Sequence, residues 1–117
     1  YNNYKINQFY ELNLSASKGD IEHLKQLYIQ GVDMNQADYD GRTPLHLAVC
    51  EKRIDVVEFL VNVVNVKITS DRWNRTPIDD AKSFINNDND NDNDNGNGNG
   101  NDILNILLDS YNFESKI

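Results

Sequence analysis

Few residues of this chain have types and spacings that could support chemistry. Ser15 and Lys18 form the pattern Ser-x-x-Lys, in which the lysine helps to activate a serine nucleophile in one class of hydrolases. Such catalysis also requires polar groups that build an oxyanion site, and no second motif follows in the sequence. A four-residue match arises easily by chance. The sequence therefore predicts that this chain is not itself an enzyme, and it assigns no catalytic residue.

The potential metal ligands also lack the spacing of a metal site. The only histidines and cysteine are His23, His46 and Cys50, and they do not form the two closely spaced ligand pairs that are typical of zinc sites. The tract 91–96 resembles the oxygen ligands and turn glycine of a calcium-binding loop, but Asp102 stands where a bidentate glutamate is expected. We interpret this tract as a low-complexity spacer, and we predict no metal and no cofactor.

Charge and cysteine content narrow the choice of partner and compartment. The chain has 117 residues, a formal net charge of −8 and a single cysteine. A negative field disfavours nucleic acids and anionic membranes as partners, and no apolar run approaches the roughly 20 residues of a membrane span. One cysteine excludes an internal disulfide and is typical of a reducing, intracellular compartment. The first residue, Tyr1, is not a methionine, which indicates a fragment whose upstream sequence is missing.

A repeated motif defines the architecture. Thr43-Pro44-Leu45-His46-Leu47-Ala48 recurs as Thr76-Pro77-Ile78-Asp79-Asp80-Ala81, with an offset of 76 − 43 = 33 residues. This period and motif are those of ankyrin repeats, in which each unit is a turn followed by two helices. Threonine is a favourable N-cap, and proline suits the first helical turn. The sequence therefore predicts an all-α ankyrin repeat solenoid of about three helix-turn-helix repeats with short β-turn fingers.

The 33-residue register also sets the expected boundaries. Residues 1–9 begin an N-terminal cap, 10–42 form a degenerate first repeat, 43–75 the second, 76–110 the third, and 111–117 a tail. Residues 86–101 alternate Asn with Asp and then Asn with Gly. A tract without apolar side chains cannot bury a core, so we expect a disordered loop inserted between the two helices of the third repeat.

The predicted finger tips carry the first candidate binding surface. Tyr39 and Trp73 occupy equivalent positions there, where no core requires an aromatic side chain. Large aromatic side chains beside arginines are typical of binding hot spots. Arg42, Arg72 and Arg75 flank them and predict a local basic edge on an acidic domain. The alternative is that Trp73 folds back on its own turn, because aromatic rings serve both purposes.

The inner-helix face is the second candidate surface, and it includes Cys50, Glu51 and Lys52. Lys52 stands where the first repeat has Gly19, a change that costs little if the backbone there is not left-handed. His46 is predicted to hydrogen-bond near the turn that joins repeats, and Leu47 to fill the interface between them. The predicted function is a protein–protein interaction module whose contact candidates are Tyr39, Arg42, Cys50, Glu51, Lys52, Arg72, Trp73 and Arg75.

Two segments carry a narrower resemblance. Residues 32–43 and 71–81 resemble the C-terminal ankyrin tail of animal-type glutaminases. The resemblance implies an upstream catalytic domain, absent from this chain, that hydrolyses glutamine to glutamate and ammonia. It also implies a tail for regulation or protein contacts, an oligomeric parent, and a cytoplasmic or mitochondrial location. The Asp71-Arg72-Trp73 turn is also similar to turns of ankyrin modules joined to plant-type kinases and asparaginases. A stand-alone adaptor, or one linked to such a protein, is therefore the alternative.

Overall fold

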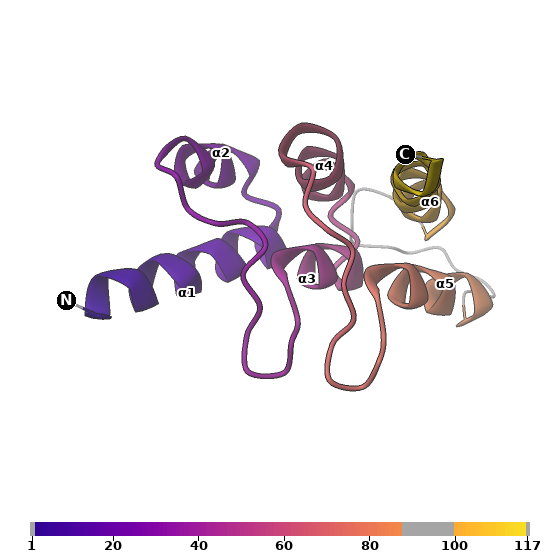
Figure 1. Cartoon of the computed structure of the whole chain (residues 1–117), viewed down its shortest axis with the longest axis horizontal. Coiled ribbons are helices and arrows are strands. Elements are labelled where there is room, and N and C mark those ends of the chain that lie inside the picture. The colour runs from indigo at the N-terminus through magenta and orange to yellow at the C-terminus, as the bar shows by residue number, and fades with distance from the viewer. Residues whose placement is uncertain (1, 88–99, 117) are drawn as a thin grey trace.

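The computed structural model describes residues 2–87 and 100–116. Its helices are α1 (Asn2–Lys18), α2 (Ile21–Ile29), α3 (Pro44–Cys50), α4 (Ile54–Glu58), the π-helical turn η1 (Phe59–Val64), α5 (Pro77–Asn87) and α6 (Gly100–Lys116). Helices α1, α3 and α5 form an inner row, α2, α4 and α6 form an outer row, and two fingers project from the inner row away from the outer helices (Figure 1). The predicted all-α ankyrin solenoid is confirmed.

The core runs along the stack between the two rows of helices. Helix α3 packs between α1 and α5, and the slots that keep the 33-residue offset hold buried apolar side chains in successive repeats. These pairs are Leu12 and Leu45, Leu24 and Val57, and Leu27 and Leu60. Each repeat therefore contacts its neighbours, and the domain has no single centre.

Leu47 was predicted to fill the interface between repeats, but it is not a core residue. Its side chain is only half-buried, whereas Leu45 is 1% exposed. The slot is not apolar throughout the stack, because Leu47 is equivalent to Asp80 one repeat later (80 − 47 = 33), where the carboxylate pairs with arginines. This slot lies on the inner face of the stack. The large loss in free energy of unfolding that was predicted for truncation of Leu47 is therefore expected for truncation of Leu45 instead.

Helix starts and corners follow the sequence closely, with one exception. Thr43 caps α3 through its side chain, which accepts the N–H of His46, and Pro44 occupies the first turn. Gly19 has the left-handed φ of +80° at the corner between α1 and α2. Lys52 has φ +58° at the equivalent corner, so the condition under which its replacement of glycine would cost little is not met. Its ammonium lies 5.0 Å from the centre of the Phe84 ring, a favourable cation–π contact.

The span from the start of the outer helix to the left-handed residue that follows it is one residue longer in the second repeat than in the first. The left-handed residues that end these helices, Gly31 and Asn65, are 65 − 31 = 34 positions apart. The finger residues Asp38 and Asp71 that follow are again 33 apart. The extra residue is accommodated by η1, since a π-helical turn is the usual form of a single insertion in a helix. The following loop is one residue shorter, and the period is preserved.

Helix boundaries differ from prediction in two segments. The predicted insertion 86–101 is helical at both ends, because α5 continues to Asn87 and α6 begins at Gly100. The remainder, 88–99, including the calcium-like tract 91–96, lies outside the described residues. The predicted tail 111–117 is part of α6 as far as Lys116.

Gly41 tests how closely the two fingers approach each other. It has φ +79°, and a Cβ added there would lie 3.2 Å from the Asp71 Cα atom. We expect Gly41→Ala to lower the free energy of unfolding by about 2–3 kcal/mol, because a left-handed strain of about 1–2 kcal/mol is joined by displacement of the next finger. Urea titration followed by circular dichroism measures this cost.

Gly31→Ala is the matched control for that substitution. Gly31 has φ +91°, but nothing lies within 4 Å of an added Cβ, so only the backbone strain of about 1–2 kcal/mol remains. Equal costs for the two variants would contradict the close approach between fingers.

Candidate partner-binding surface of the fingers and inner helices

Each finger is folded by its own aspartate. The Asp38 carboxylate accepts the backbone N–H groups of Asp40 at 2.8 Å and Arg42 at 3.0 Å. Asp71 repeats this arrangement with Trp73 at 2.9 Å and Arg75 at 3.0 Å. Such local carboxylate–backbone bonds favour turns, so the fingers are preformed. The predicted β-turn fingers are confirmed.

The pKa of Asp71 reflects this arrangement. Burial works against its charged form, but the backbone N–H groups of Arg75 and Trp73, followed by the Arg42 side chain, outweigh burial and hold the pKa below its ordinary value of 3.8. A carboxylate that accepts several hydrogen bonds is stabilised in its ionised form. Asp71 is therefore charged at neutral pH.

Arg72 links the tips of the two fingers. Its backbone N–H donates to the Asp40 carbonyl oxygen at 2.8 Å, and its guanidinium donates to the Asp40 carboxylate at 3.1 Å. The same guanidinium carbon lies 5.7 Å from the centre of the Tyr39 ring and 5.5 Å from that of Trp73. Tyr39 is 92% exposed and Trp73 is 59% exposed. The structure thus brings two aromatic side chains together around one cation and leaves much of both rings accessible.

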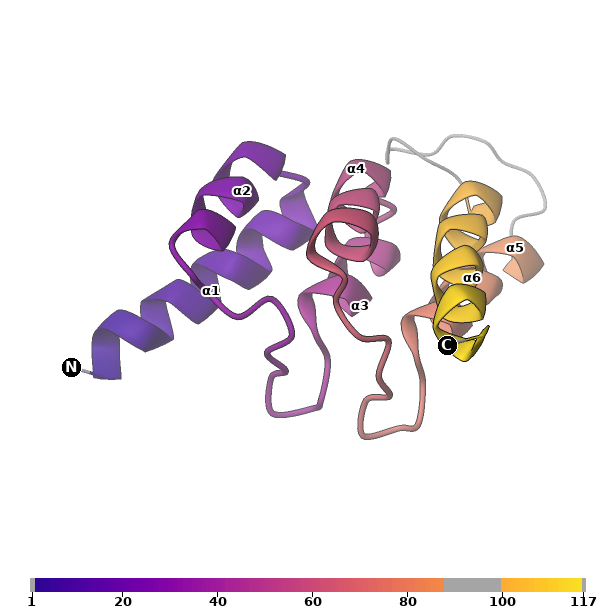
Figure 2. The same ribbon diagram turned by 45° about the horizontal axis from the view of Figure 1, so that its top comes forward.

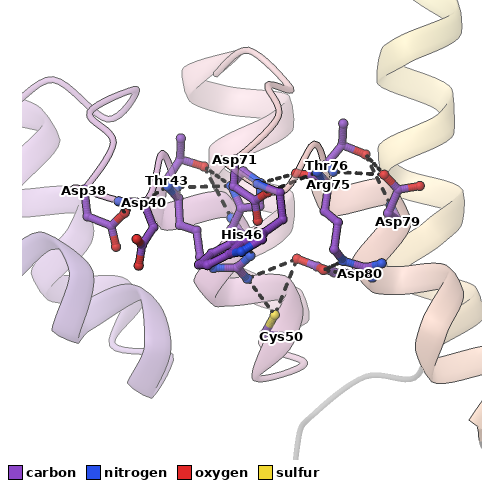
Figure 3. Close-up of polar contacts among 12 residues, drawn as sticks. Asp38, Asp40, Thr43, His46, Cys50, Asp71, Arg75, Thr76, Asp79 and Asp80 are labelled. Atoms are coloured by element: carbon purple, nitrogen blue, oxygen red, sulfur yellow. Dashed lines mark hydrogen bonds and ion pairs between the residues drawn. The ribbon is translucent and has the colours of Figure 1, made fainter.

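Arg42, the last residue of the first repeat, contacts both of the repeats that follow. Its guanidinium donates to the Asp71 carboxylate at 2.7 Å, to the Asp80 carboxylate at 3.1 Å and to the Cys50 sulfur at 3.1 Å; Figure 3 shows these acceptors converging. The Asp71 side chain is fully buried and that of Arg42 is 19% exposed. This position makes Arg42 a link between repeats. Sequence reasoning missed the ion pairs that Asp71 and Asp80 make with Arg42, although Asp38 and Asp71 recur with the 33-residue period.

The three arginines do not form the predicted basic edge. Arg72 pairs with Asp40 at 3.1 Å, and Arg75 pairs with Asp80 at 3.3 Å. Arg42 is paired as described above, so each guanidinium faces at least one aspartate. The sequence did not reveal this neutralisation because most of the pairs join different repeats.

Cys50, Glu51 and Lys52 lie at the opposite end of α3 from its finger. Burial, followed by the charge of Asp80, raises the pKa of the Cys50 thiol to about 11. The thiol is therefore protonated at neutral pH and is a poor nucleophile. Glu51 is exposed where α3 ends. The structure does not bring this group together with the aromatic tips, although Arg42 reaches from the finger to Cys50.

His46 connects repeats as predicted. Its Nδ1 accepts the Thr43 backbone N–H at 3.1 Å, and its Nε2 lies 3.1 Å from the carbonyl oxygen of Arg75, the residue that immediately precedes the third repeat (Figure 3). This pair of contacts fits the neutral tautomer that carries its proton on Nε2. Burial above all, together with the charge of Arg42, lowers the pKa of His46 below 6.5.

This lowered pKa predicts a pH dependence of stability. As pH falls below 6.5, His46 becomes protonated in the unfolded chain but stays neutral in the folded chain, because its folded pKa is lower. The free energy of unfolding therefore decreases until the pH falls below the folded pKa. Above 6.5 this contribution is fully present. This pH dependence corresponds to the uptake of less than one proton on unfolding between about pH 7 and about pH 5. We expect it to be absent in His46→Gln, which keeps one hydrogen-bond donor and one acceptor but does not titrate. Urea titrations across this range measure it, and an unchanged slope in the variant would assign the proton to another group.

The described residues offer little for other chemistry. Ser15 is 5% exposed within α1, in the slot that holds Ala48 in the next repeat. Across residues 2–87 and 100–116, no group of three His, Cys, Asp or Glu side chains could hold a metal ion. Within the same ranges, the helices are too short or too polar to cross a membrane.

Comparisons with known proteins agree with the architecture. A putative glutaminase 2 of Caenorhabditis elegans is 47% identical over 70 residues, which cover 59% of this chain and 12% of that protein. The mitochondrial liver isoform of glutaminase from Rattus norvegicus is 45% identical over 74 residues, 62% of this chain and 12% of its own length. Serine/threonine-protein kinase 12 of Arabidopsis thaliana is 44% identical over 73 residues, 62% of this chain and 16% of its length. The chain thus spans only a small part of these relatives.

A family model covers most of the chain. The model for ankyrin repeats, in three copies, matches residues 12–116, which include both Thr-Pro helix starts, both fingers and the helices from the C-terminal part of α1 to α6. The chain belongs to the ankyrin repeat family.

Proposed function

We propose that this chain is the non-catalytic, protein-binding ankyrin part of a larger glutaminase, and that its finger tips contact the partner. Ankyrin stacks generally present extended binding surfaces. The observation that carries the proposal is the pair of exposed aromatic side chains at the tips, with Tyr39 92% and Trp73 59% exposed. Exposed tyrosine and tryptophan are typical interface anchors.

The other contact candidates differ in how directly they would contact the partner. Arg72 orients both rings and offers its half-exposed guanidinium to the partner. Arg42 and Arg75 act indirectly, because their ion pairs hold the second finger in place. Cys50, Glu51 and Lys52 form a separate candidate contact at the end of α3 that lies away from the fingers. A preformed surface of this kind loses little conformational entropy on binding.

The glutaminase assignment is supported by relatives of two animal species at 47% and 45% identity. It carries with it an intracellular location, in the cytoplasm or in mitochondria, and an oligomeric parent. The alternative is an ankyrin adaptor unrelated to glutamine, which the kinase relative at 44% identity supports. Sequencing the parent transcript upstream of Tyr1 decides between them. A hydrolase-sized reading frame with Ser-x-x-Lys supports the glutaminase, and a different domain or a nearby start codon refutes it.

The non-catalytic part of the proposal has its own assay. Incubation of the purified chain with glutamine should release no ammonia, because Ser15 is buried in the packed helix α1. Sustained release that Ser15→Ala abolishes would overturn this proposal.

Trp73→Ala tests the finger-tip surface. We expect the variant to bind a partner recovered with the wild-type chain more weakly by more than about 1 kcal/mol, because a large exposed anchor is removed. The melting temperature should hardly change, since Trp73 is 59% exposed. Isothermal titration calorimetry and thermal unfolding measure the two quantities. A large fall in melting temperature with unaltered affinity would instead mean that the ring packs on its own finger.

A further inference from the structure

Helices α2 and α4 are neighbours in the outer row, on the side of the stack away from the fingers (Figure 2). A groove lies between α2 and the segment formed by α4 and η1. It has a volume of about 510 Å³. Its apolar lining comes from Ile21 on α2 and from Phe59 and Val63 on η1. The groove shares no residue with the finger tips, so the inference drawn from it goes beyond the proposed function.

The π-helical turn forms one wall of this groove. Val63, in the turn that accommodates the extra residue, is 56% exposed although it is apolar, and the neighbouring Asn62 also lines the groove. Turns of this kind occur frequently at functional sites. The shortened loop that follows keeps the fingers in register, so this irregularity is confined to the outer face.

The groove is also fixed in shape. The rings of Tyr28 on α2 and Phe59 on η1 meet edge to face, with their centres 5.8 Å apart and their planes at 89°. Leu24 on α2 and Val57 on α4 are fully buried. The ring contact joins the two walls without a ligand, which lowers the reorganisation cost of binding.

Charge identifies the occupant. Asp55 and Glu58 line the groove from α4, and Lys25 lines it from α2, so its rim is net acidic in a chain whose formal charge is −8. We propose that this groove binds an amphipathic helix of another protein, whose apolar face enters between α2 and η1 and whose Lys or Arg side chains face α4. Helix-in-groove docking is a recurrent mode of recognition, and two neighbouring helices provide the ridges for it. A second copy of this chain fits poorly, because two bodies of charge −8 repel each other.

The test begins with a phage-displayed library selected on the 117-residue chain. The library holds peptides of about 16 residues with fixed leucines at helical spacing and with all other positions random. Recovered peptides should be enriched in Lys and Arg over Asp and Glu beside the leucine face. A selection that recovers no binder, or binders without this bias, overturns the proposal.

Groove variants then locate the binding site of the strongest recovered peptide. Glu58→Lys and Val63→Asp alter exposed residues, so the fold should persist, and each should weaken binding by at least about tenfold in fluorescence anisotropy. Ile29→Asp and Glu22→Lys are the matched controls on α2 outside the groove lining. They should change the dissociation constant by less than about twofold.

Two further results separate this groove from other surfaces. Trp73→Ala should leave peptide affinity unchanged, and peptides sensitive to Trp73→Ala but not to Val63→Asp would refute the groove while supporting the finger tips. Analytical ultracentrifugation should show that the chain does not dimerise through the groove, that is, it should detect no dimer that is lost in Val63→Asp. Such a dimer would make a second copy the occupant and would overturn the assignment to a basic helix.

Discussion

Leu45→Ala should lower the free energy of unfolding by about 2–5 kcal/mol. Leu45 is 1% exposed on α3, which packs between α1 and α5. Truncation leaves a cavity at the centre of the stack, and a solenoid of few repeats is stable only through the interfaces between neighbours. Because a domain of this size has a total stability of about 5–15 kcal/mol, we expect partial or complete unfolding at 37 °C. Urea titration monitored by circular dichroism measures the loss.

Leu14→Ala is the matched control for this prediction. Leu14 is also a leucine of the inner row, but it is 38% exposed, so its truncation should cost less than about 1 kcal/mol. Equal costs at the two positions would mean that the inner row is not packed as described.

Arg42→Met should lower the melting temperature by about 10 °C, because removing one partner of a buried ion pair leaves its carboxylates without compensation. The Asp71 side chain is 0% exposed, and Asp80, which keeps Arg75, is 8% exposed. The apolar part of the arginine is largely retained by methionine, so the loss reports on charge. Differential scanning calorimetry measures the shift.

Acid provides an independent check on this interpretation. The pKa of Asp71 is lowered in the folded chain, so its contribution to stability is present above its ordinary pKa of 3.8 and is lost as pH falls through the lower folded value. Once protonated, the side chain no longer needs the cation. The difference between wild type and Arg42→Met should therefore be largest near neutral pH and shrink below about pH 4.

Arg72→Met is the control for the charge argument. Its pair with Asp40 is 53% and 39% exposed at the two side chains, and exposed ion pairs contribute little to stability. A shift as large as that of Arg42→Met would show that burial does not distinguish the two pairs.

The repeat architecture was predictable because its signals are local. Thr43 and Pro44 mark the start of helix α3. Gly19 and Gly31 adopt the left-handed conformations expected at the corner between two helices and at the end of a helix. The identity of these residues follows from backbone geometry alone. Periodicity then fixes which slots are apolar, and this information sufficed for the fold.

Features that depend on contacts between repeats were harder to predict. Lys52 adopts a left-handed conformation that its side chain disfavours, since the corner geometry is imposed by the packing of α3 against α4. Arg42 was interpreted as a surface cation because its partners lie 29 and 38 residues away. An aspartate at position 80 instead of the leucine of position 47 was the available signal that this slot faces polar surroundings.

The extra residue in η1 has a consequence for engineering. Consensus design and repeat grafting move segments by counting 33 positions, and here that count fails between Leu60 and Asp71 while it holds on either side. A transplant cut inside this interval would import the insertion without its matching deletion and would shift Asp71 by one residue relative to Arg42. Exchanges of repeats should therefore be cut at Leu60 and at Asp71, so that both changes travel together.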